Sequence, residues 1–172
     1  MIIKRNKPEK SYIIQQMTSS KIYEAIKSQQ LSDIKKLLED YGKLRNHDDA
    51  LGDYLNELNN LPGDYSAPKG CLLIAYYNDK PAGCVAYKKI GEEICEMKRL
   101  YVKNEFRGEK IGEKLVLELL NKGRENKFRL MRLDTHPWMN AAQNLYQKFG
   151  FREVERYNNN PTKGIRFFEL KL

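Results

Sequence analysis

The segment from residue 100 to residue 112 carries the residues whose types and spacing best suit ligand binding. An apolar run, Leu100–Val102, leads through a short polar stretch to Arg107-Gly108-Glu109-Lys110-Ile111-Gly112, where helical periodicity begins. A strand that enters a Gly-containing turn and then a helix presents unpaired backbone N–H groups at the positive end of the helix dipole. Because Arg107 and Lys110 add positive charge, the segment predicts a site for an anion such as a phosphate or pyrophosphate.

Two other kinds of phosphate loop do not fit the spacing. The sequence has no GxxxxGKS or GxxxxGKT, which excludes a P-loop, and no GxGxxG follows its first predicted strand, which argues against a dinucleotide-binding fold. Gly108 and Gly112 allow the backbone to approach a ligand closely. They would equally suit a tight strand-to-helix turn that binds nothing, and the loop alone does not separate these interpretations.

Hydrophobic periodicity predicts the elements that hold this loop in place. The predicted strands are 22–27, 71–77, 81–89, 93–102, 129–135, 151–157 and 165–171. The predicted helices follow an N-cap at Ser32, cover 48–60, run through the apolar positions from Ile111 to Leu120, and cover 138–148. The order β-α-α-β-β-β-α-β-α-β-β indicates an α/β sandwich around one sheet.

Length and composition narrow the class of protein. The chain has 172 residues, of which 41% are hydrophobic and 31% charged, an ordinary balance for one globular domain. No apolar run approaches the ~20 residues that span a bilayer, and no apolar block follows the basic N-terminus, so we expect a cytoplasmic protein without a secretory signal. Cys71, Cys84 and Cys95 lack a CxxC spacing and are expected to be small core residues rather than metal ligands.

The net charge of +8 raises the hypothesis of a nucleic-acid-binding module. Residues 1–21 hold five basic residues against one Glu, which accounts for half of that charge. No helix-turn-helix spacing, zinc finger or RNP-like aromatic set supports the hypothesis, so we expect no nucleic-acid partner. We interpret residues 1–20 as a basic extension and residues 21–172 as the single domain.

Two segments resemble the signature motifs of the GNAT acetyltransferases. MKRLYVKNEFRGEKIGEKLVLELL (97–120) is similar to the family's acyl-CoA motif, R/Q-x-x-G-x-G/A after a strand. AAQNLYQKFGFREVERY (141–157) is similar to its second motif, A-x-x-L-Y-x-K-x-G-F. One predicted strand separates the two motifs, as in the family, and the order of elements matches from residue 22 to residue 172.

The resemblance implies a GNAT-like acyl-CoA N-acyltransferase fold, a mixed and mostly antiparallel sheet flanked by helices, with acetyl-CoA as co-substrate. The fourth and fifth strands of that fold splay apart, and the pantetheine arm lies between them, paired to backbone groups like an added strand. The cofactor-binding residues implied in this way are Leu100, Tyr101, Val102, Arg107, Gly108, Glu109, Lys110, Ile111, Gly112 and Asn140.

Two positions depart from the family pattern. Lys110 stands at the central glycine of the acyl-CoA motif, where its side chain must point away from the phosphates, although its N–H and its ammonium group can still bind them. The asparagine common seven residues before the signature tyrosine is replaced by Met139, and Asn140 follows one position later. This shift weakens any role given to Asn140.

Acyl transfer to an amine needs a neutral amine and a protonated leaving thiolate. The resemblance implies that Tyr146 donates that proton, and the alternative is a core aromatic. Glu96 lies eleven residues before Arg107, where some members of the family carry a catalytic glutamate, so the resemblance makes it the candidate general base. The alternative is a strand glutamate paired with a basic neighbour. His136 at the end of a predicted strand is a second candidate base, since histidine titrates near neutrality.

The sequence therefore predicts an N-acetyltransferase that moves an acetyl group from acetyl-CoA to a primary amine of a small molecule or peptide, by direct attack in a ternary complex. The alternative is a non-catalytic acyl-CoA-binding sensor of the same fold. Acceptor specificity is expected from residues 28–61, 62–70 and 158–164. Residues 165–171 are a candidate for pairing with a second copy in a homodimer. The candidate pocket aromatics are Tyr54, Tyr65, Trp138 and Tyr157.

Overall fold

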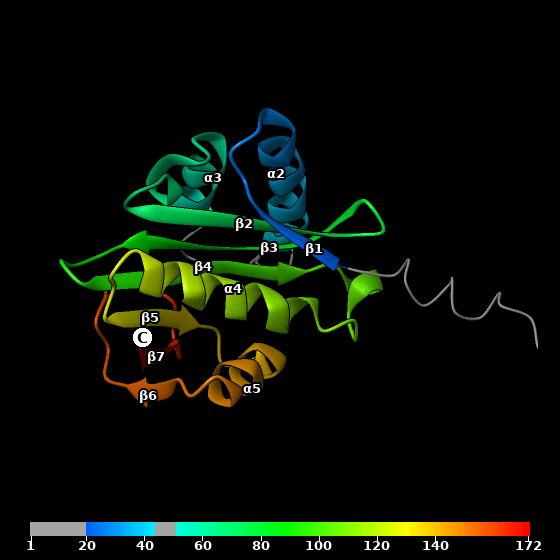
Figure 1. Cartoon of the computed structure of the whole chain (residues 1–172). Coiled ribbons are helices and arrows are strands. Elements are labelled where there is room, and N and C mark those ends of the chain that lie inside the picture. Colours follow the sequence, from blue (N-terminus) through cyan, green and yellow to red (C-terminus); the bar gives the residue numbers. More distant parts are fainter. Residues whose placement is uncertain (1–19, 44–50) are drawn as a thin grey trace, which may run out of the picture.

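A seven-stranded sheet organises the computed structural model, which describes residues 20–43 and 51–172 (Figure 1). Its strands are β1 (Ser20–Glu24), β2 (Gly70–Tyr77), β3 (Lys80–Lys89), β4 (Ile94–Val102), β5 (Leu130–Thr135), β6 (Arg152–Val154) and β7 (Arg166–Lys171). Their spatial order is β1-β2-β3-β4-β5-β7-β6, and the β4–β5 pair is parallel while the other pairs are antiparallel. The predicted mixed, mostly antiparallel sheet is confirmed. Nearly all of the predicted basic extension, 1–20, lies outside the described residues.

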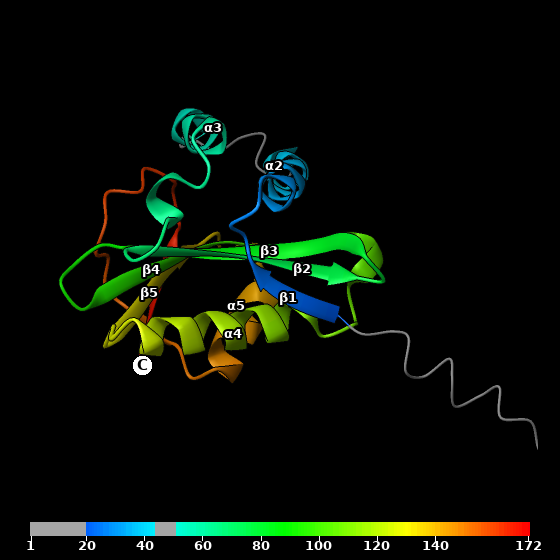
Figure 2. The same ribbon diagram turned by 45° about the horizontal axis from the view of Figure 1, so that its top comes forward.

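Helices cover both faces of the sheet (Figure 2). The helices are α2 (Ser28–Lys43), α3 (Leu51–Asn59), α4 (Ile111–Glu125) and α5 (Asn140–Lys148), with short 3₁₀ turns η1 (Gly63–Tyr65) and η2 (Asn104–Phe106). One core cluster packs α2 and α3 on β2 and β3 through buried residues such as Ile34, Leu37 and Leu72. The other packs α4 and α5 on the opposite face through residues such as Leu115 and Met131. The three cysteines are buried and unbridged, as expected.

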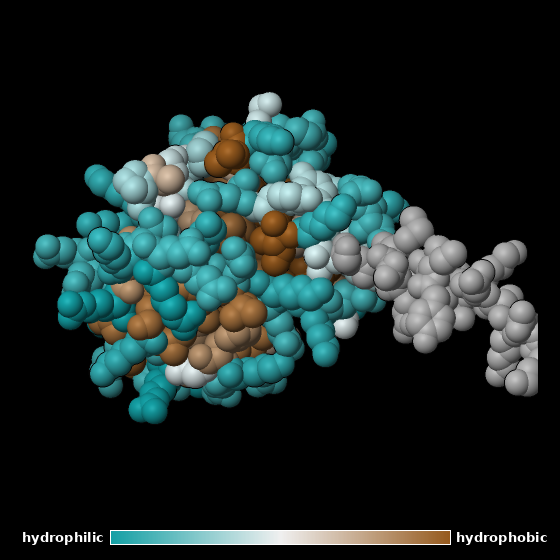
Figure 3. Space-filling model, viewed as in Figure 1, coloured by the Kyte–Doolittle hydropathy of each residue, from teal (hydrophilic) through white to brown (hydrophobic). Residues whose placement is uncertain are grey.

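The surface agrees with this layering. On the face shown in Figure 3 hydrophilic side chains predominate, and hydrophobic ones gather between α4 and α5. None of the helices in the described ranges has the length and apolarity that crossing a membrane would require.

Several predicted boundaries were wrong. α2 begins at Ser28 rather than after Ser32, because the side-chain oxygen of Gln30 accepts hydrogen bonds from the backbone N–H groups of Ile26 (3.2 Å) and Lys27 (3.0 Å) just before the helix. β1 correspondingly ends at Glu24 rather than at residue 27.

The terminal hairpin also differs from its prediction. β6 ends at Val154 rather than at residue 157, because the chain leaves the sheet there and directs the next side chains onto β4. β7 lies between β5 and β6, so residues 167–169 have strand partners on both sides. This arrangement is inconsistent with β7 as a free edge for pairing with a second copy.

The predicted splay of β4 and β5 is present. The two strands pair only from Ile94 to Glu96. Beyond that point β4 contains a β-bulge: the register with β3 shifts between Cys84 and Ala86, and Arg99 has a φ of 61°. A bulge adds one residue to a strand and bends it, so β4 separates from β5 there.

A buried ion pair fixes this bulge to α3. Arg99 donates from Nε and Nη2 to the two carboxylate oxygens of Glu57, at 2.6 and 2.7 Å, and its guanidinium lies 4.6 Å from the centre of the Tyr54 ring. Burial opposes ionisation of Glu57, but the Arg99 contacts outweigh it and leave the pKa of that carboxyl below its ordinary value.

We expect Glu57→Ala to lower the free energy of unfolding by about 2–3 kcal/mol, because it leaves the Arg99 guanidinium buried without its counter-ion. Urea unfolding followed by circular dichroism measures this loss. Glu93→Ala is the matched control, since it removes an exposed ion pair with Arg129 and should leave the unfolding midpoint unchanged. Equal midpoints for Glu57→Ala and the wild type would show that the pair does not stabilise the bulge.

Candidate active site

A cavity of about 400 Å³ lies where β4 and β5 separate. Its walls come from the middle of β4, the end of β5, α5 with the residue before it, and the loop between β6 and β7, and residues of α2, α3 and β3 complete the lining. The lining residues that carry the argument below are Glu96, Lys98, Asp134, His136, Tyr146 and Asn158. The predicted acid and the predicted base, 50 positions apart in the sequence, therefore line one cavity.

Glu96 is held in this cavity through one of its two carboxylate oxygens. Its side chain is buried, and Oε1 accepts hydrogen bonds from the Tyr157 hydroxyl at 2.8 Å and from Asn158 Nδ2 at 3.1 Å. Lys98 Nζ lies 3.4 Å from the same oxygen. Within the described part of the chain no hydrogen bond reaches Oε2, so one oxygen fixes the side chain and the other remains available to accept a proton.

A second carboxylate lies beside Glu96. Asp134 accepts hydrogen bonds from Lys98 Nζ (2.9 Å), Asn158 Nδ2 (2.9 Å) and Asn160 Nδ2 (3.1 Å). Burial alone would raise the pKa of the Asp134 carboxyl, but these neighbours outweigh it and lower the pKa to about 2. The two carboxylates and the one ammonium group leave the cluster with an excess negative charge, which suits an incoming cationic amine.

Tyr146 is buried against Phe151 and Phe168, with ring centroids 5.9 and 6.4 Å away. Burial raises the pKa of its phenol well above the ordinary value, so the hydroxyl stays protonated. No group among the described residues forms a hydrogen bond with that hydroxyl. The Tyr146 hydroxyl therefore has no competing acceptor in the described part of the chain.

His136 also lines the cavity, and its ring stacks on Trp138 at 5.2 Å. Its backbone carbonyl accepts a hydrogen bond from Gln143, which fixes it to α5. The structure thus places both candidate bases, Glu96 and His136, on the walls of one cavity.

The predicted anion loop lies at the N-terminus of α4. Gly108 has a φ of 91°, a conformation that favours glycine, and Lys110 precedes the helix in the left-handed region with a φ of 57°. No side chain caps α4, and the backbone N–H groups of residues 108–110 form no backbone hydrogen bond within the described ranges. Lys110 therefore adopts a left-handed turn itself, and the loop presents N–H donors at a helix N-terminus.

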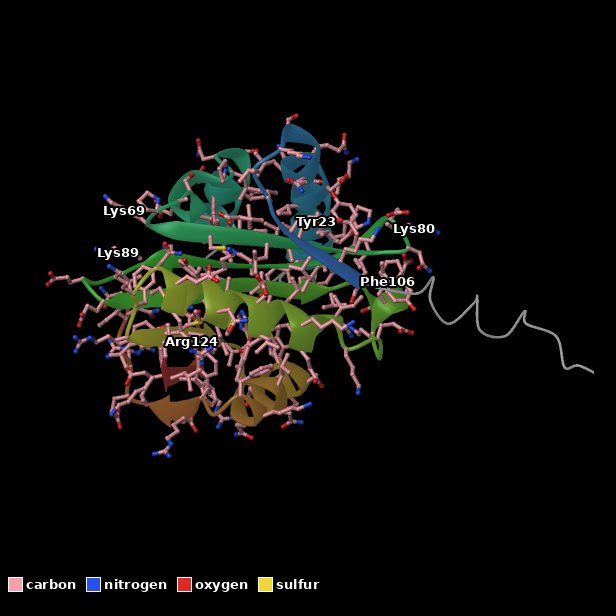
Figure 4. All side chains as sticks on the ribbon, viewed as in Figure 1. Tyr23, Lys69, Lys80, Lys89, Phe106 and Arg124 are labelled. Atoms are coloured by element: carbon pink, nitrogen blue, oxygen red, sulfur yellow. The ribbon has the colours of Figure 1, made fainter. Side chains whose placement is uncertain are left out.

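The turn before this loop is anchored to the neighbouring hairpin. The Phe106 ring lies 5.6 Å from the Tyr77 ring, and both Phe106 and Lys80 lie at the end of the sheet where β2 turns into β3 (Figure 4). The 3₁₀ turn that Phe106 closes therefore starts the loop from a fixed position on the sheet.

The other predicted cofactor contacts are placed unequally. In Leu100–Val102 the backbone pairs with β3 on one side, through Tyr101 opposite Cys84, and lies beyond the β5 pairing on the other. That open edge is what an added strand needs. Asn140 is exposed at the start of α5, and Met139 lines the cavity instead. Of the four candidate pocket aromatics, Tyr54 is the one that lines the cavity.

The sequence comparison now decides the family. The model of the acetyltransferase (GNAT) family matches residues 31–151. The chain belongs to this family. An uncharacterised N-acetyltransferase of Schizosaccharomyces pombe is 36% identical to it, over 84% of this chain and 90% of the relative. An uncharacterised N-acetyltransferase of Dictyostelium discoideum is 31% identical, over 88% and 98% respectively.

The fold comparison agrees. The PaiA N-acetyltransferase of Thermoplasma acidophilum, solved in complex with coenzyme A, superposes with a TM-score of 0.69 and 21% identity, over 90% of this chain and 99% of that one. This GNAT chain is accordingly an N-acetyltransferase with acyl-CoA as its co-substrate, and the predicted fold, activity and cofactor are confirmed. Among its described residues no group of three or more His, Cys, Asp or Glu side chains is placed to hold a metal ion.

Proposed function

We propose that this GNAT enzyme transfers an acetyl group from acetyl-CoA to a primary amine of a small molecule or peptide, by direct attack of the amine in a ternary complex. The observation that carries the proposal is the cavity at the β4–β5 splay. It combines a fixed carboxylate with an available oxygen, Glu96 Oε2, and a buried protonated phenol, Tyr146.

Acetyl-CoA binds along the open edge of β4 and across the start of α4. The backbone of Leu100–Val102 pairs with the pantetheine amides, and the N–H groups of Arg107–Gly112 hold the pyrophosphate at the positive end of the helix dipole. Lys110 contributes its N–H from the left-handed turn. This placement brings the thioester to the splay, next to Glu96.

The acceptor enters from the cluster of Glu96, Lys98 and Asp134. Its ammonium form is attracted by the excess negative charge of that cluster, and Glu96 Oε2 accepts one proton from it, directly or through water. The neutral nitrogen attacks the thioester carbon, and the C–S bond breaks as the C–N bond forms. The nitrogen, positively charged after the attack, loses its second proton to water. Tyr146 gives its proton to the departing sulfur and regains one from solvent, and Glu96 releases to solvent the proton that it accepted.

A thiol-release assay tests this proposal. Free CoA is titrated with a disulfide reagent while acetyl-CoA and a panel of amino acids, polyamines and peptides are supplied. The enzyme's own cysteines are buried and give no background signal. Turnover with at least one amine supports the proposal. Saturable acetyl-CoA binding without turnover on any amine would favour the acyl-CoA sensor instead.

Tyr146→Phe should lower kcat by about 10- to 50-fold, because the thiolate then leaves without a proton donor. The ring and its contacts with Phe151 and Phe168 remain, so the KM for acetyl-CoA should change little. Tyr87→Phe is the control: it removes a hydroxyl that accepts a hydrogen bond from Asn126, away from the cavity. An unchanged kcat in Tyr146→Phe would show that the hydroxyl is not the proton donor and that Tyr146 is a core aromatic residue.

The finer predictions rest on the sequence. Residues 21–172 as one catalytic domain, a cytoplasmic location and a homodimer stay predictions. Light scattering on the purified chain tests the last of these. A dimer would have to use a surface other than the paired central part of β7.

A further inference from the structure

One side chain spans the gap between the splayed strands. Asn158, in the loop between β6 and β7, directs its amide nitrogen at two carboxylates, Glu96 on β4 (3.1 Å) and Asp134 on β5 (2.9 Å). An amide NH₂ has two donors, and these two contacts use both. The Asn158 oxygen accepts a hydrogen bond from the backbone N–H of Asn160 at 3.0 Å, so the amide orientation is fixed at both ends.

The Asn158 bridge connects β4 to β5 beyond the point where the backbone pairing of these two strands ends. β4 and β5 pair as far as Glu96 opposite Arg132, so Asp134 lies beyond the last paired residue. Two carboxylates in a buried site repel each other unless donors lie between them. Lys98 Nζ is closer to Asp134 (2.9 Å) than to Glu96 (3.4 Å). Asn158 is therefore a donor that ties Glu96 directly to the β5 side of the splay.

The loop that carries Asn158 is itself held against the same pair. Asn160 Oδ1 accepts the backbone N–H of Thr162 (3.0 Å), and its Nδ2 donates to Asp134 (3.1 Å). Asparagine side chains that bond backbone two residues onward build tight local turns. The neighbouring Tyr157 donates to the same Glu96 oxygen as Asn158, from the adjacent position in the chain. The β6–β7 loop is thus built around the two carboxylates.

We propose that Asn158 is a positioning residue for acyl transfer: it holds Glu96 by Oε1 and keeps Oε2 directed at the incoming amine. The inference rests on the proposed role of Glu96 as general base. Asn158 does not touch the reacting atoms. Its effect is on how often the base is in the orientation that accepts the proton, so it acts on kcat and leaves cofactor binding alone.

Asn158→Ala should lower kcat about 10-fold, since a misplaced base loses much of its contribution while other interactions remain. The KM of the amine and the Kd of acetyl-CoA should stay within about twofold by the same argument. Asn158→Asp keeps the shape but loses the donor and adds a third carboxylate, so its kcat should be lower than that of the alanine variant. Asn158→Gln keeps the amide and should recover part of the activity. Steady-state kinetics and calorimetry measure these values.

Asn121→Ala is the matched control, because Asn121 is an exposed asparagine of α4 that contacts Arg124 and does not line the cavity. It should leave kcat unchanged. Wild-type kcat in Asn158→Ala, or equal losses in Asn158→Gln and Asn158→Asp, would overturn the inference. If the alanine variant does not fold, the comparison of Asn158→Asp with Asn158→Gln decides. Wild-type enzyme without turnover on any amine would defeat the proposed function and this inference together, whereas turnover with insensitive Asn158 variants defeats this inference alone.

Discussion

Glu96→Gln lowers kcat by about 10²- to 10³-fold and leaves the Kd for acetyl-CoA unchanged, if Glu96 is the general base. The substitution is nearly isosteric. The amide oxygen of the variant can still accept the hydrogen bonds that Tyr157 and Asn158 give to Oε1. Its NH₂ group then takes the place of Oε2, the oxygen without a partner in the described chain. The cavity keeps its shape and loses its proton acceptor.

The pH dependence separates a lost base from a damaged cavity. Raising the pH increases the neutral fraction of a primary amine, whose ordinary pKa is about 10.4 for a lysine side chain. The activity of Glu96→Gln should therefore rise more steeply with pH than that of the wild type. Glu93→Gln makes the same change on an exposed residue paired with Arg129 and should leave activity intact. Near-wild-type kcat in Glu96→Gln at neutral pH would transfer the base role to His136 or to water.

Local signals in the sequence were sufficient to predict the loop that we propose for the cofactor. The run from Leu100 to Gly112 contains the strand, the turn and the helix start in consecutive residues, so its geometry follows from nearby chain. Gly108 does have the positive φ that a glycine in such a turn suggests. Lys110 could have broken the motif, yet it adopts the left-handed conformation itself. The N–H donors of a turn belong to the backbone, so they depend on the backbone conformation and not on the side chain. The loop therefore keeps these donors although Lys110 stands at a glycine position of the motif.

The cluster of Glu96, Lys98, Asp134 and Asn158 depends on contacts that no local sequence pattern encodes. Glu96 and Asn158 are 62 positions apart and Lys98 and Asp134 are 36 apart, and only the sheet order brings them together. The three asparagines 158–160 were interpreted from the sequence as part of a specificity loop, without partners. The sequence feature that could have drawn attention to them is the run of three amide side chains before Pro161. The Ser32 prediction failed for a related reason, since Gln30 supplied an equivalent acceptor nearby.

The bulge at Arg99 could not be predicted from the sequence either. Its positive φ is unusual for a non-glycine residue and is held by Glu57 and Tyr54 on α3. These partners lie more than forty positions earlier. The resemblance to the GNAT family implied that the strands splay, whereas the structure shows which ion pair holds the splay open.

Gly108→Pro should weaken acetyl-CoA binding about 100-fold, equivalent to about 2.7 kcal/mol, and so make the largest change in cofactor affinity. Proline fixes φ near −65°, which is incompatible with the 91° observed at this position, and it also removes an N–H from the loop. Gly108→Ala should cause a smaller loss, because a Cβ there meets no atom within 4 Å and only the backbone conformation is strained. Isothermal titration of acetyl-CoA into each variant gives the order.

The control for this series is Gly63→Ala. Gly63 also has a positive φ, of 46°, and a Cβ there likewise meets no atom within 4 Å, but it lies in η1 away from α4. Its variant also places an alanine at a positive φ and should bind acetyl-CoA like the wild type. A Gly108→Pro protein that binds acetyl-CoA as tightly as the wild type would place the pyrophosphate elsewhere. Graded loss from alanine to proline at 108, with none at 63, would tie the affinity to the backbone N–H groups at the start of α4.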